Sequence, residues 1–186
     1  MKSLLNTVFV VAIWLQPFAA TGADREGGDG MMDAATRWQR AALNREWAAS
    51  TRIERAEELL TQAKDLQAKE STDLEERKRR FAQAGNLELA AAKLFGLACA
   101  GYDKAQANWN MLADLCRKAE DEEKEKRARQ LGERAAASAT AACGKAAHAC
   151  ELAANSFSKP NAGQAERAAG AGEQAAMWWE RLAARK

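Results

Sequence analysis

The stretch LELAAAKLFGLACAGYDKAQANWNMLADLCRKA, from Leu87 to Ala119, decides the fold of this chain. Counting by sevens through it gives one row of mostly large residues: Phe95, Tyr102, Trp109 and Cys116. The positions three residues later form a second row, of small and apolar side chains: Ala98, Ala105, Leu112 and Ala119. Two apolar rows that repeat every seven residues are typical of a helix that packs along its length on other helices, and alanine in one row lets a partner approach closely.

The segments on either side repeat this pattern, and nothing in them is typical of a strand. A helix is expected from Asp33, a good N-cap residue, with alanines at intervals of seven: Ala35, Ala42, Ala49, Ala56 and Ala63. A helix over 135–157 has at this interval Ala136, Cys143, Cys150 and Phe157, and one over 162–184 has Ala168, Ala175 and Leu182. The sequence therefore predicts an all-α fold, an elongated three- to four-helix bundle with coiled-coil-like, alanine-rich heptad packing.

Breaks between the helices are expected at three places. A turn is predicted at Gly85-Asn86, because Asn86 can cap a new helix and an unbroken helix from 33 to 119 would be about 130 Å long. The charged segment DEEKEKRARQLGER, from 121 to 134, is interpreted as the solvated tip of a hairpin or a connector between helices. Pro160 cannot continue a helix and pushes the preceding residue into extended geometry.

The first 23 residues are typical of a secretory signal peptide. A positive charge at Lys2 precedes an apolar run from Leu4 to Ala20, and small residues up to Ala23 allow cleavage there. The alternative is a retained membrane anchor, which the short run and Pro17 disfavour. We expect a signal peptide over 1–23, a flexible leader over 24–32, a single helical-bundle domain over 33–186, and a periplasmic or secreted protein, membrane-anchored if uncleaved.

Four cysteines follow this segment: Cys99, Cys116, Cys143 and Cys150. An even number of cysteines behind a signal peptide favours disulfides. Residues seven apart on one helix are about 10 Å apart, beyond disulfide reach, so any bond must join two helices. Two straight helices cannot hold both of the nested bonds Cys99–Cys150 and Cys116–Cys143 unless the first helix breaks near Gly101. The preferred single bond is Cys116–Cys143, across a turn near Arg129–Gly132.

Two features suggest a partner surface. Trp47 and Trp178 lie off the apolar rows of their helices, so they are candidates for contact with another protein. The chain has one cluster of basic residues, which could dock on an anionic surface or be a solvated face neutralised by its acidic neighbours: Arg77, Lys78, Arg79 and Arg80. The formal net charge of the chain is only +2, which gives no general attraction to nucleic acid.

No pattern of catalytic or metal-ligating residues stands out. His148 is the single histidine, and its spacing of five from Cys143 turns the two side chains to different helix faces, so no metal, cofactor or catalytic triad is expected. We expect a non-catalytic structural or interaction protein that binds another protein or a second copy through helix–helix contacts. The alternative is a carrier of a small ligand or metal, with a pocket in the bundle lined by Phe95, Tyr102, Trp109 and His148.

Overall fold

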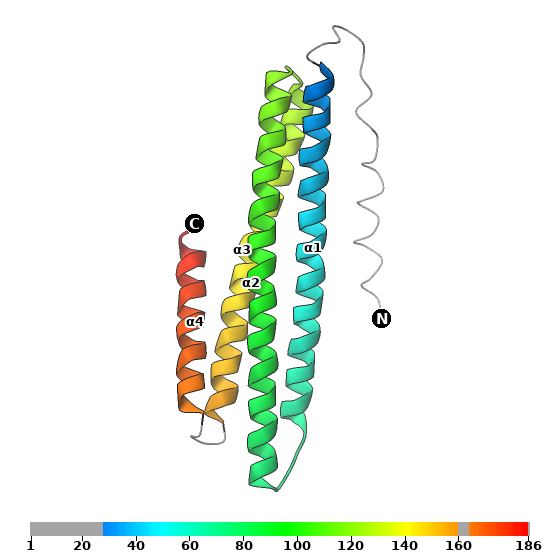
Figure 1. The fold of residues 1–186 in the computed structure, drawn as a ribbon. Helices are drawn as coiled ribbons and strands as arrows, with labels where there is room; N and C mark the ends of the chain where they lie inside the picture. Colours follow the sequence, from blue (N-terminus) through cyan, green and yellow to red (C-terminus); the bar gives the residue numbers. More distant parts are fainter. Residues whose placement is uncertain (1–27, 160–163, 186) are drawn as a thin grey trace.

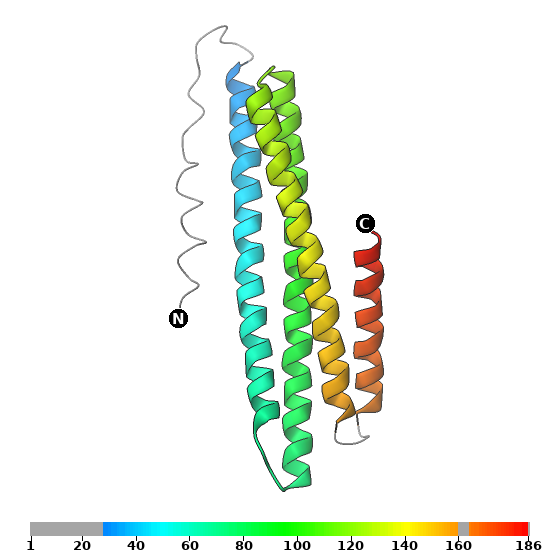
Figure 2. The same ribbon diagram turned by 180° about the vertical axis from the view of Figure 1, so that it is seen from behind.

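The computed structural model describes residues 28–159 and 164–185, and these residues form an elongated bundle of helices (Figure 1). Within these two ranges there are four helices and no strand: α1 (Gly28–Ala68), α2 (Leu74–Lys118), α3 (Glu122–Ser158) and α4 (Ala165–Ala183). Each helix runs antiparallel to the one before it (Figures 1 and 2). The prediction of an all-α helical bundle is confirmed.

The fourth helix makes the two halves of the bundle different. The first three helices run side by side over most of the length of the molecule, whereas α4 has only 19 residues and stops about halfway along it (Figures 1 and 2). It packs mainly on α3, and Trp178 reaches from it to α2. One half of the bundle is therefore built from four helices and the other half from three.

Alanine fills much of the interfaces between the helices, and the predicted row of α1 is buried. The five alanines of α1 at intervals of seven are at most 6% exposed. Phe95, Trp109 and Cys116 of α2 are buried, and Tyr102 is half-buried. Side chains this small let helices approach closely: a Cβ added at Gly101 of α2 would lie 3.2 Å from the Cβ of Ala49 in α1.

The ends of the first two helices differ from the predicted ones. α1 begins at Gly28 rather than Asp33, so residues 28–32 of the expected leader are helical, and Met31 and Met32 are half-buried. The expected signal peptide lies outside the described residues. The break between α1 and α2 is at residues 69–73, where Asp73 caps α2 by accepting a hydrogen bond from the backbone N–H of Glu75.

The predicted turn at Gly85-Asn86 is wrong, and so is the alternative break near Gly101, because α2 is continuous from 74 to 118. Gly85 is buried in the middle of this helix against Phe157 of α3. A Cβ at this position would lie 2.6 Å from the phenylalanine ring. The glycine is needed for close packing between helices, a role that the sequence does not distinguish from a turn.

The connection between α2 and α3 is also shorter than predicted. It comprises only Ala119, Glu120 and Asp121, and Glu120 has a positive φ of 56°, the left-handed conformation that often ends a helix. The Asp121 side chain then accepts a hydrogen bond from the backbone N–H of Lys124, so it caps α3. The charged segment from 121 to 134 is therefore the start of a helix and not a hairpin tip.

The predicted end of α3 is confirmed. The helix ends at Ser158, and Lys159, which precedes Pro160, is extended with φ −107° and ψ 139°. After the undescribed residues 160–163, α4 begins at Ala165, close to the predicted start. Gly170 and Gly172 have no atom within 4 Å of an added Cβ, so these glycines make no close helix contact.

Candidate functional site

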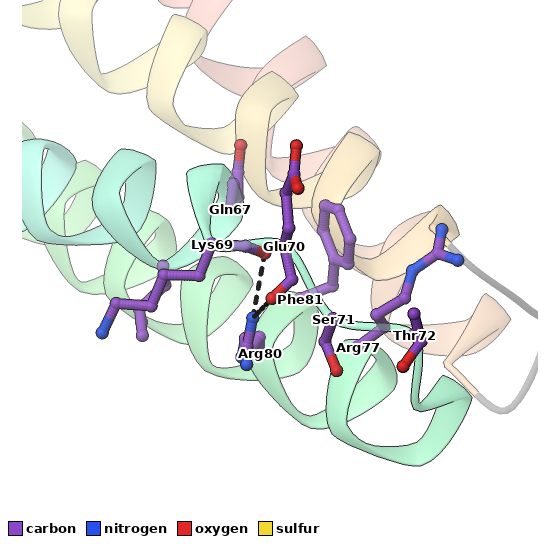
Figure 3. Close-up of a pocket in the computed structure, with 9 residues that line it drawn as sticks. Gln67, Lys69, Glu70, Ser71, Thr72, Arg77, Arg80 and Phe81 are labelled. Atoms are coloured by element: carbon purple, nitrogen blue, oxygen red, sulfur yellow. Dashed lines mark hydrogen bonds between the residues drawn. The ribbon is translucent and has the colours of Figure 1, made fainter.

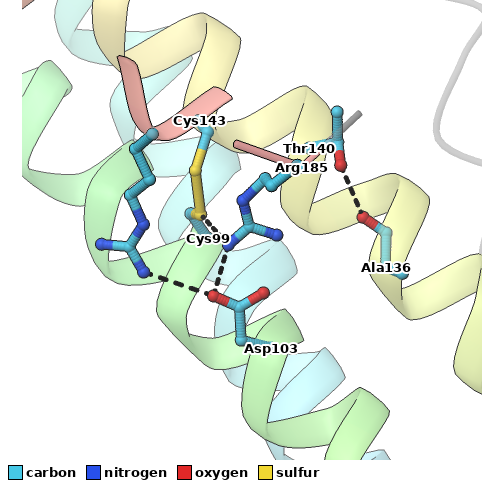
Figure 4. The surroundings of a disulfide bond; sticks show 7 residues. Cys99, Asp103, Ala136, Thr140, Cys143 and Arg185 are labelled. Carbon is cyan, nitrogen blue, oxygen red and sulfur yellow. Dashed lines mark hydrogen bonds and ion pairs between the residues drawn. A yellow bond between two sulfur atoms is a disulfide. The ribbon is translucent and has the colours of Figure 1, made fainter. Parts of the chain in front are cut away.

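A disulfide joins α2 to α3 at the middle of the bundle (Figure 4). It links Cys99 to Cys143, with their Cα atoms 5.5 Å apart. The expected bond between the two helices is therefore present, but the preferred pairing of Cys116 with Cys143 is wrong. In two antiparallel helices, residues at equal distances from the turn lie opposite each other. The observed turn contains Asp121, midway between 99 and 143, so Cys99 faces Cys143. A turn near 129–132 would instead place residue 116 opposite Cys143.

The other two cysteines are free thiols and both are buried. Burial raises the pKa of Cys150 to about 11, and Glu151 contributes in the same direction. Burial is also the largest cause of the raised pKa of Cys116, and the negative charge of Asp121 raises this pKa further. A raised pKa keeps a thiol protonated and poorly nucleophilic at neutral pH. These two residues therefore behave as small apolar core residues rather than as reactive groups.

A cluster of charged side chains from α2 and the end of α4 lies next to the disulfide (Figure 4). Arg185 donates from Nη2 to Asp103 Oδ2 at 2.5 Å and lies 3.3 Å from Cys99 Sγ. Arg181, one turn earlier, donates to the same carboxylate oxygen at 3.3 Å. The Arg185 side chain is only 18% exposed, and its Nε is buried without a hydrogen-bond partner.

Sequence reasoning did not single out this cluster. Arg181 and Arg185 are four residues apart, a spacing that places side chains on one face of a helix, and this spacing was the available signal although α4 itself ends at Ala183. Their carboxylate partner, Asp103, lies far away in the sequence, and only the register set by the α2–α3 turn places it opposite the end of α4.

The second feature is a groove of about 550 Å³ between α2 and α4. It is lined by Leu89, Ala92, Lys93, Gly96, Leu97, Gln174 and Trp178. Trp178 packs directly on Gly96, where a Cβ would lie 2.5 Å from the indole ring. Leu97 is 47% exposed, and Met177, one residue before Trp178, is 67% exposed. The groove is therefore mostly apolar, and one of its apolar side chains, Leu97, is largely exposed.

The two tryptophans predicted to lie on a partner surface have different environments. Trp178 is half-buried and packs on the core clusters around Phe95 and Cys99, so much of it belongs to the contact between α4 and the rest of the bundle. Trp47 is 72% exposed on α1 and belongs to none of the core clusters. The structure therefore leaves Trp47 accessible to a partner and offers only part of Trp178.

The basic run lies at the start of α2, and part of it closes the connection to α1. Arg80 donates to the backbone carbonyl of Lys69 at 2.9 Å (Figure 3). It is also paired with Glu76. Lys78 pairs with Glu75 at 2.7 Å. Two of the four basic residues therefore have acidic partners on the same helix. This agrees with the interpretation that the run is a solvated face neutralised by its acidic neighbours.

The remaining residues of the run, Arg77 and Arg79, are exposed. Arg77 lines an open recess of about 680 Å³ beside this connection (Figure 3). The other residues that line the recess are Leu66, Gln67, Lys69, Glu70, Ser71, Thr72, Arg80 and Phe81. The lining is mixed in charge and polarity, so it does not select one class of ligand.

The residues of the alternative carrier pocket do not line a common cavity. Phe95, Tyr102 and Trp109 pack in three different core clusters along the bundle. The His148 side chain is 64% exposed, with Nδ1 3.4 Å from Glu151 Oε2. Over residues 28–159 and 164–185, no group of three or more acidic, cysteine or histidine side chains is placed to hold a metal ion.

A buried polar cluster lies between α1, α2 and α3. Glu88 is 3% exposed and accepts hydrogen bonds from Ser156 Oγ at 2.6 Å and Gln67 Nε2 at 2.8 Å. Burial raises the pKa of Glu88, and the two hydrogen bonds oppose this effect. Glu88 lies seven residues before Phe95, so its charge occupies the apolar row of α2. The structure shows how it is accommodated, by one neutral donor from each neighbouring helix.

A second buried contact links α1 to α2. Trp109 Nε1 donates to Glu46 Oε1 at 2.6 Å, and burial raises the pKa of Glu46.

In the part of the chain that the structure describes, no helix combines the length and the apolar character needed to cross a membrane. Comparison with models of known protein families, with curated proteins and with solved structures finds no match to this chain.

Proposed function

We propose that this chain is an exported, non-catalytic interaction protein of the cell envelope or extracellular space, which binds a partner helix in the groove between α2 and α4. The groove is the observation that carries the proposal. Its floor is apolar at Ala92, Gly96 and Trp178, and its small side chains let another helix approach closely. Leu97, which lines the groove and is 47% exposed, offers apolar surface that an apolar helix face would cover.

The charges beside the groove indicate the kind of helix that fits it. Lys93 lines the groove, and Arg181 lies with its guanidinium 5.4 Å from the centre of the Trp178 ring. A partner with an apolar face flanked by Asp or Glu would therefore complement this surface in both shape and charge. The partner is another protein or a second copy of the chain.

Two observations support export. The disulfide between Cys99 and Cys143 is a bond typical of oxidising compartments. The amino-terminal sequence also has the charge, apolar run and small residues of a signal peptide. Intact-mass measurement of the protein from its native host tests this part of the proposal. A chain that begins near Asp24 supports export with cleavage, and a chain that retains residues 1–23 contradicts it.

The binding surface is tested by site-specific photo-crosslinking in the native host. A crosslinking amino acid at Leu97 or Gln174 should capture the same partner, because both residues line the groove and are exposed. The matched control is position 47, which is also exposed but lies on α1, outside the groove. Capture of that partner at 97 and 174 but not at 47 supports the proposal. Equal capture at all three positions, or none at the groove, contradicts it.

A further inference from the structure

The Cys99–Cys143 disulfide is fully buried, although the helix that covers one side of it is the shortest in the bundle. Both cysteines are 0% exposed. The cluster that encloses them includes alanines of α1, α2 and α3, together with two half-buried side chains of α4, Trp178 and Leu182. α4 therefore forms the part of this enclosure that lies on the outside of the bundle (Figures 1 and 4).

α4 is held to the bundle by fewer buried residues than any of the other three helices. Only Ala171 and Ala175 of its 19 residues are buried. A helix of this length is marginal in water without tertiary contacts, and a segment with few buried contacts opens at a lower free energy than the whole protein unfolds. Near its carboxyl end, α4 contacts α3 through Leu182, whose Cδ2 would lie 3.8 Å from a Cβ added at Gly144, and through a hydrogen bond from Trp179 Nε1 to Glu151 Oε1 at 2.7 Å. It contacts α2 through the ion pairs of Arg181 and Arg185 with Asp103.

We propose that α4 is a detachable cover over the Cys99–Cys143 disulfide, held closed by Leu182 and by the Arg181 and Arg185 pairs with Asp103. The disulfide is reduced by a dithiol when α4 lifts, while α1, α2 and α3 remain folded. The bundle thereby has a redox-sensitive bond whose accessibility depends on the position of one helix. A partner that displaces α4 would expose this bond.

The reaction at the exposed bond is ordinary thiol–disulfide exchange. One thiolate of the dithiol attacks a sulfur of the disulfide, which forms a mixed disulfide and releases the other cysteine as a thiolate. The second thiolate of the dithiol then displaces the remaining cysteine. The two cysteines leave as thiols after taking up two protons, and the dithiol is oxidised to a cyclic disulfide.

Arg185 could affect this reaction in two opposite ways. Its guanidinium lies 3.3 Å from Cys99 Sγ, so in the closed state it would stabilise a thiolate on that sulfur. It also holds α4 closed through Asp103. Because Arg185 follows α4 directly, it moves away when the helix lifts and cannot assist the reaction that follows. The covering effect therefore dominates, and loss of the arginine should accelerate reduction.

The experiment measures how fast dithiothreitol reduces the full-length native protein, with alkylation of Cys99 and Cys143 followed by mass spectrometry. Arg185→Ala should be reduced about 3- to 10-fold faster than wild type, and Leu182→Ala about tenfold or more, where tenfold corresponds to about 1.4 kcal/mol. The matched control for the arginine is Arg55→Ala, which removes an exposed ion pair on α1 and should leave the rate unchanged.

The control for global unfolding is Leu112→Ala. Leu112 is buried in the core cluster of the three-helix half, away from α4, so its loss lowers overall stability without loosening the cover. The proposal requires that Leu182→Ala accelerates reduction and that Leu112→Ala does not. It is overturned if both accelerate reduction in proportion to their loss of thermal stability, because reduction then proceeds through global unfolding. It is also overturned if Arg185→Ala slows reduction.

Discussion

Glu88 shows how a single buried carboxylate is tolerated in an alanine-rich core. Both of its hydrogen-bond donors, Gln67 and Ser156, are neutral, and neither α1 nor α3 supplies it with a cation. Desolvation of the charged form therefore raises its pKa. The hydrogen bonds link three helices at one level of the bundle, so this residue contributes to the register of the packing even though its charge is costly.

A first prediction follows from the sign of this shift. As pH rises above about 4.3, the ordinary pKa of glutamate, the unfolded chain loses the Glu88 proton while the folded protein retains it. Stability from this group is therefore highest below that pH and falls as pH rises through the raised pKa of the folded state. Glu88→Gln cannot ionise, so its melting temperature relative to wild type should be higher at pH 7 than at pH 4.

Thermal melting of both proteins at the two pH values checks this expectation. Glu46, the other carboxylate whose pKa burial raises, is present in both proteins and cancels in the difference. A difference in melting temperature that is the same at pH 4 and pH 7 would show that burial of the Glu88 charge does not limit stability.

Trp109 is the residue that best tests the packing of α2. It is 2% exposed, and its indole N–H is bonded to Glu46. Trp109→Ala should lower the free energy of unfolding by about 3–5 kcal/mol and the melting temperature by on the order of ten degrees. Trp47→Ala removes the same side chain from a site that is 72% exposed, and should change stability by no more than about 0.5 kcal/mol. Equal melting temperatures for the two variants would contradict the packed core.

At the scale of the helices, glycine has opposite roles in α2 and α4. Gly96 faces the ring of Trp178, and a Cβ added at Gly96 would lie 2.5 Å from this ring. A Cβ added at Gly172 would instead meet no atom within 4 Å. Gly96→Ala should therefore destabilise the protein by about 1–3 kcal/mol through overpacking. Gly172→Ala should stabilise it by about 0.5–1 kcal/mol, because alanine loses less backbone entropy in a helix.

Thermal melting checks the two glycine variants together, since the expected changes have opposite signs. Near-UV circular dichroism should also report the displaced Trp178 ring in Gly96→Ala but not in Gly172→Ala. A stabilising effect of Gly96→Ala would show that Trp178 moves aside without loss, and that the contact between α2 and α4 is looser than its geometry indicates.

The core positions of α1 were predictable from the sequence, and so was the end of α3 before Pro160, whereas the turns that separate the first three helices were not. The five alanines of α1 at intervals of seven are all buried, because burial follows helical periodicity directly. The turn predicted at Gly85 is absent, because Gly85 packs closely on Phe157 within a continuous helix. The sequence alone does not distinguish such a glycine from one that ends a helix. The separate turn between α2 and α3 contains Glu120 in a left-handed conformation, a position where glycine is the usual residue.

At the scale of the whole molecule, the disulfide ties α2 to α3 across a sequence separation of 44. Closing a loop of this length restricts the unfolded chain and typically stabilises a protein by about 2–4 kcal/mol. Reduction should therefore lower the melting temperature by on the order of ten degrees. Thermal melting with and without a reductant measures this, and Cys99→Ala/Cys143→Ala is the control, because its melting temperature should not respond. A wild-type midpoint that is unchanged by complete reduction would contradict this prediction.

The candidate sites were less accessible to sequence reasoning than the fold, because each combines residues from helices whose register the sequence left open. The pairing of Cys99 with Cys143 requires the position of the α2–α3 turn, and the approach of Arg185 to Asp103 requires in addition the position of α4. An error of a few residues in one turn therefore changed the predicted disulfide partner while leaving the predicted core positions intact.

The alanine-filled interfaces also determine how this chain can vary. Ala42, Ala49 and Ala56 have no exposed surface, so any larger side chain there must push two helices apart along the bundle. The outward positions between them face solvent and accept most side chains. In a library of random single substitutions selected for folding, tolerated changes in α1 should therefore rise and fall with a period of seven residues, with glycine and serine the main replacements at the minima.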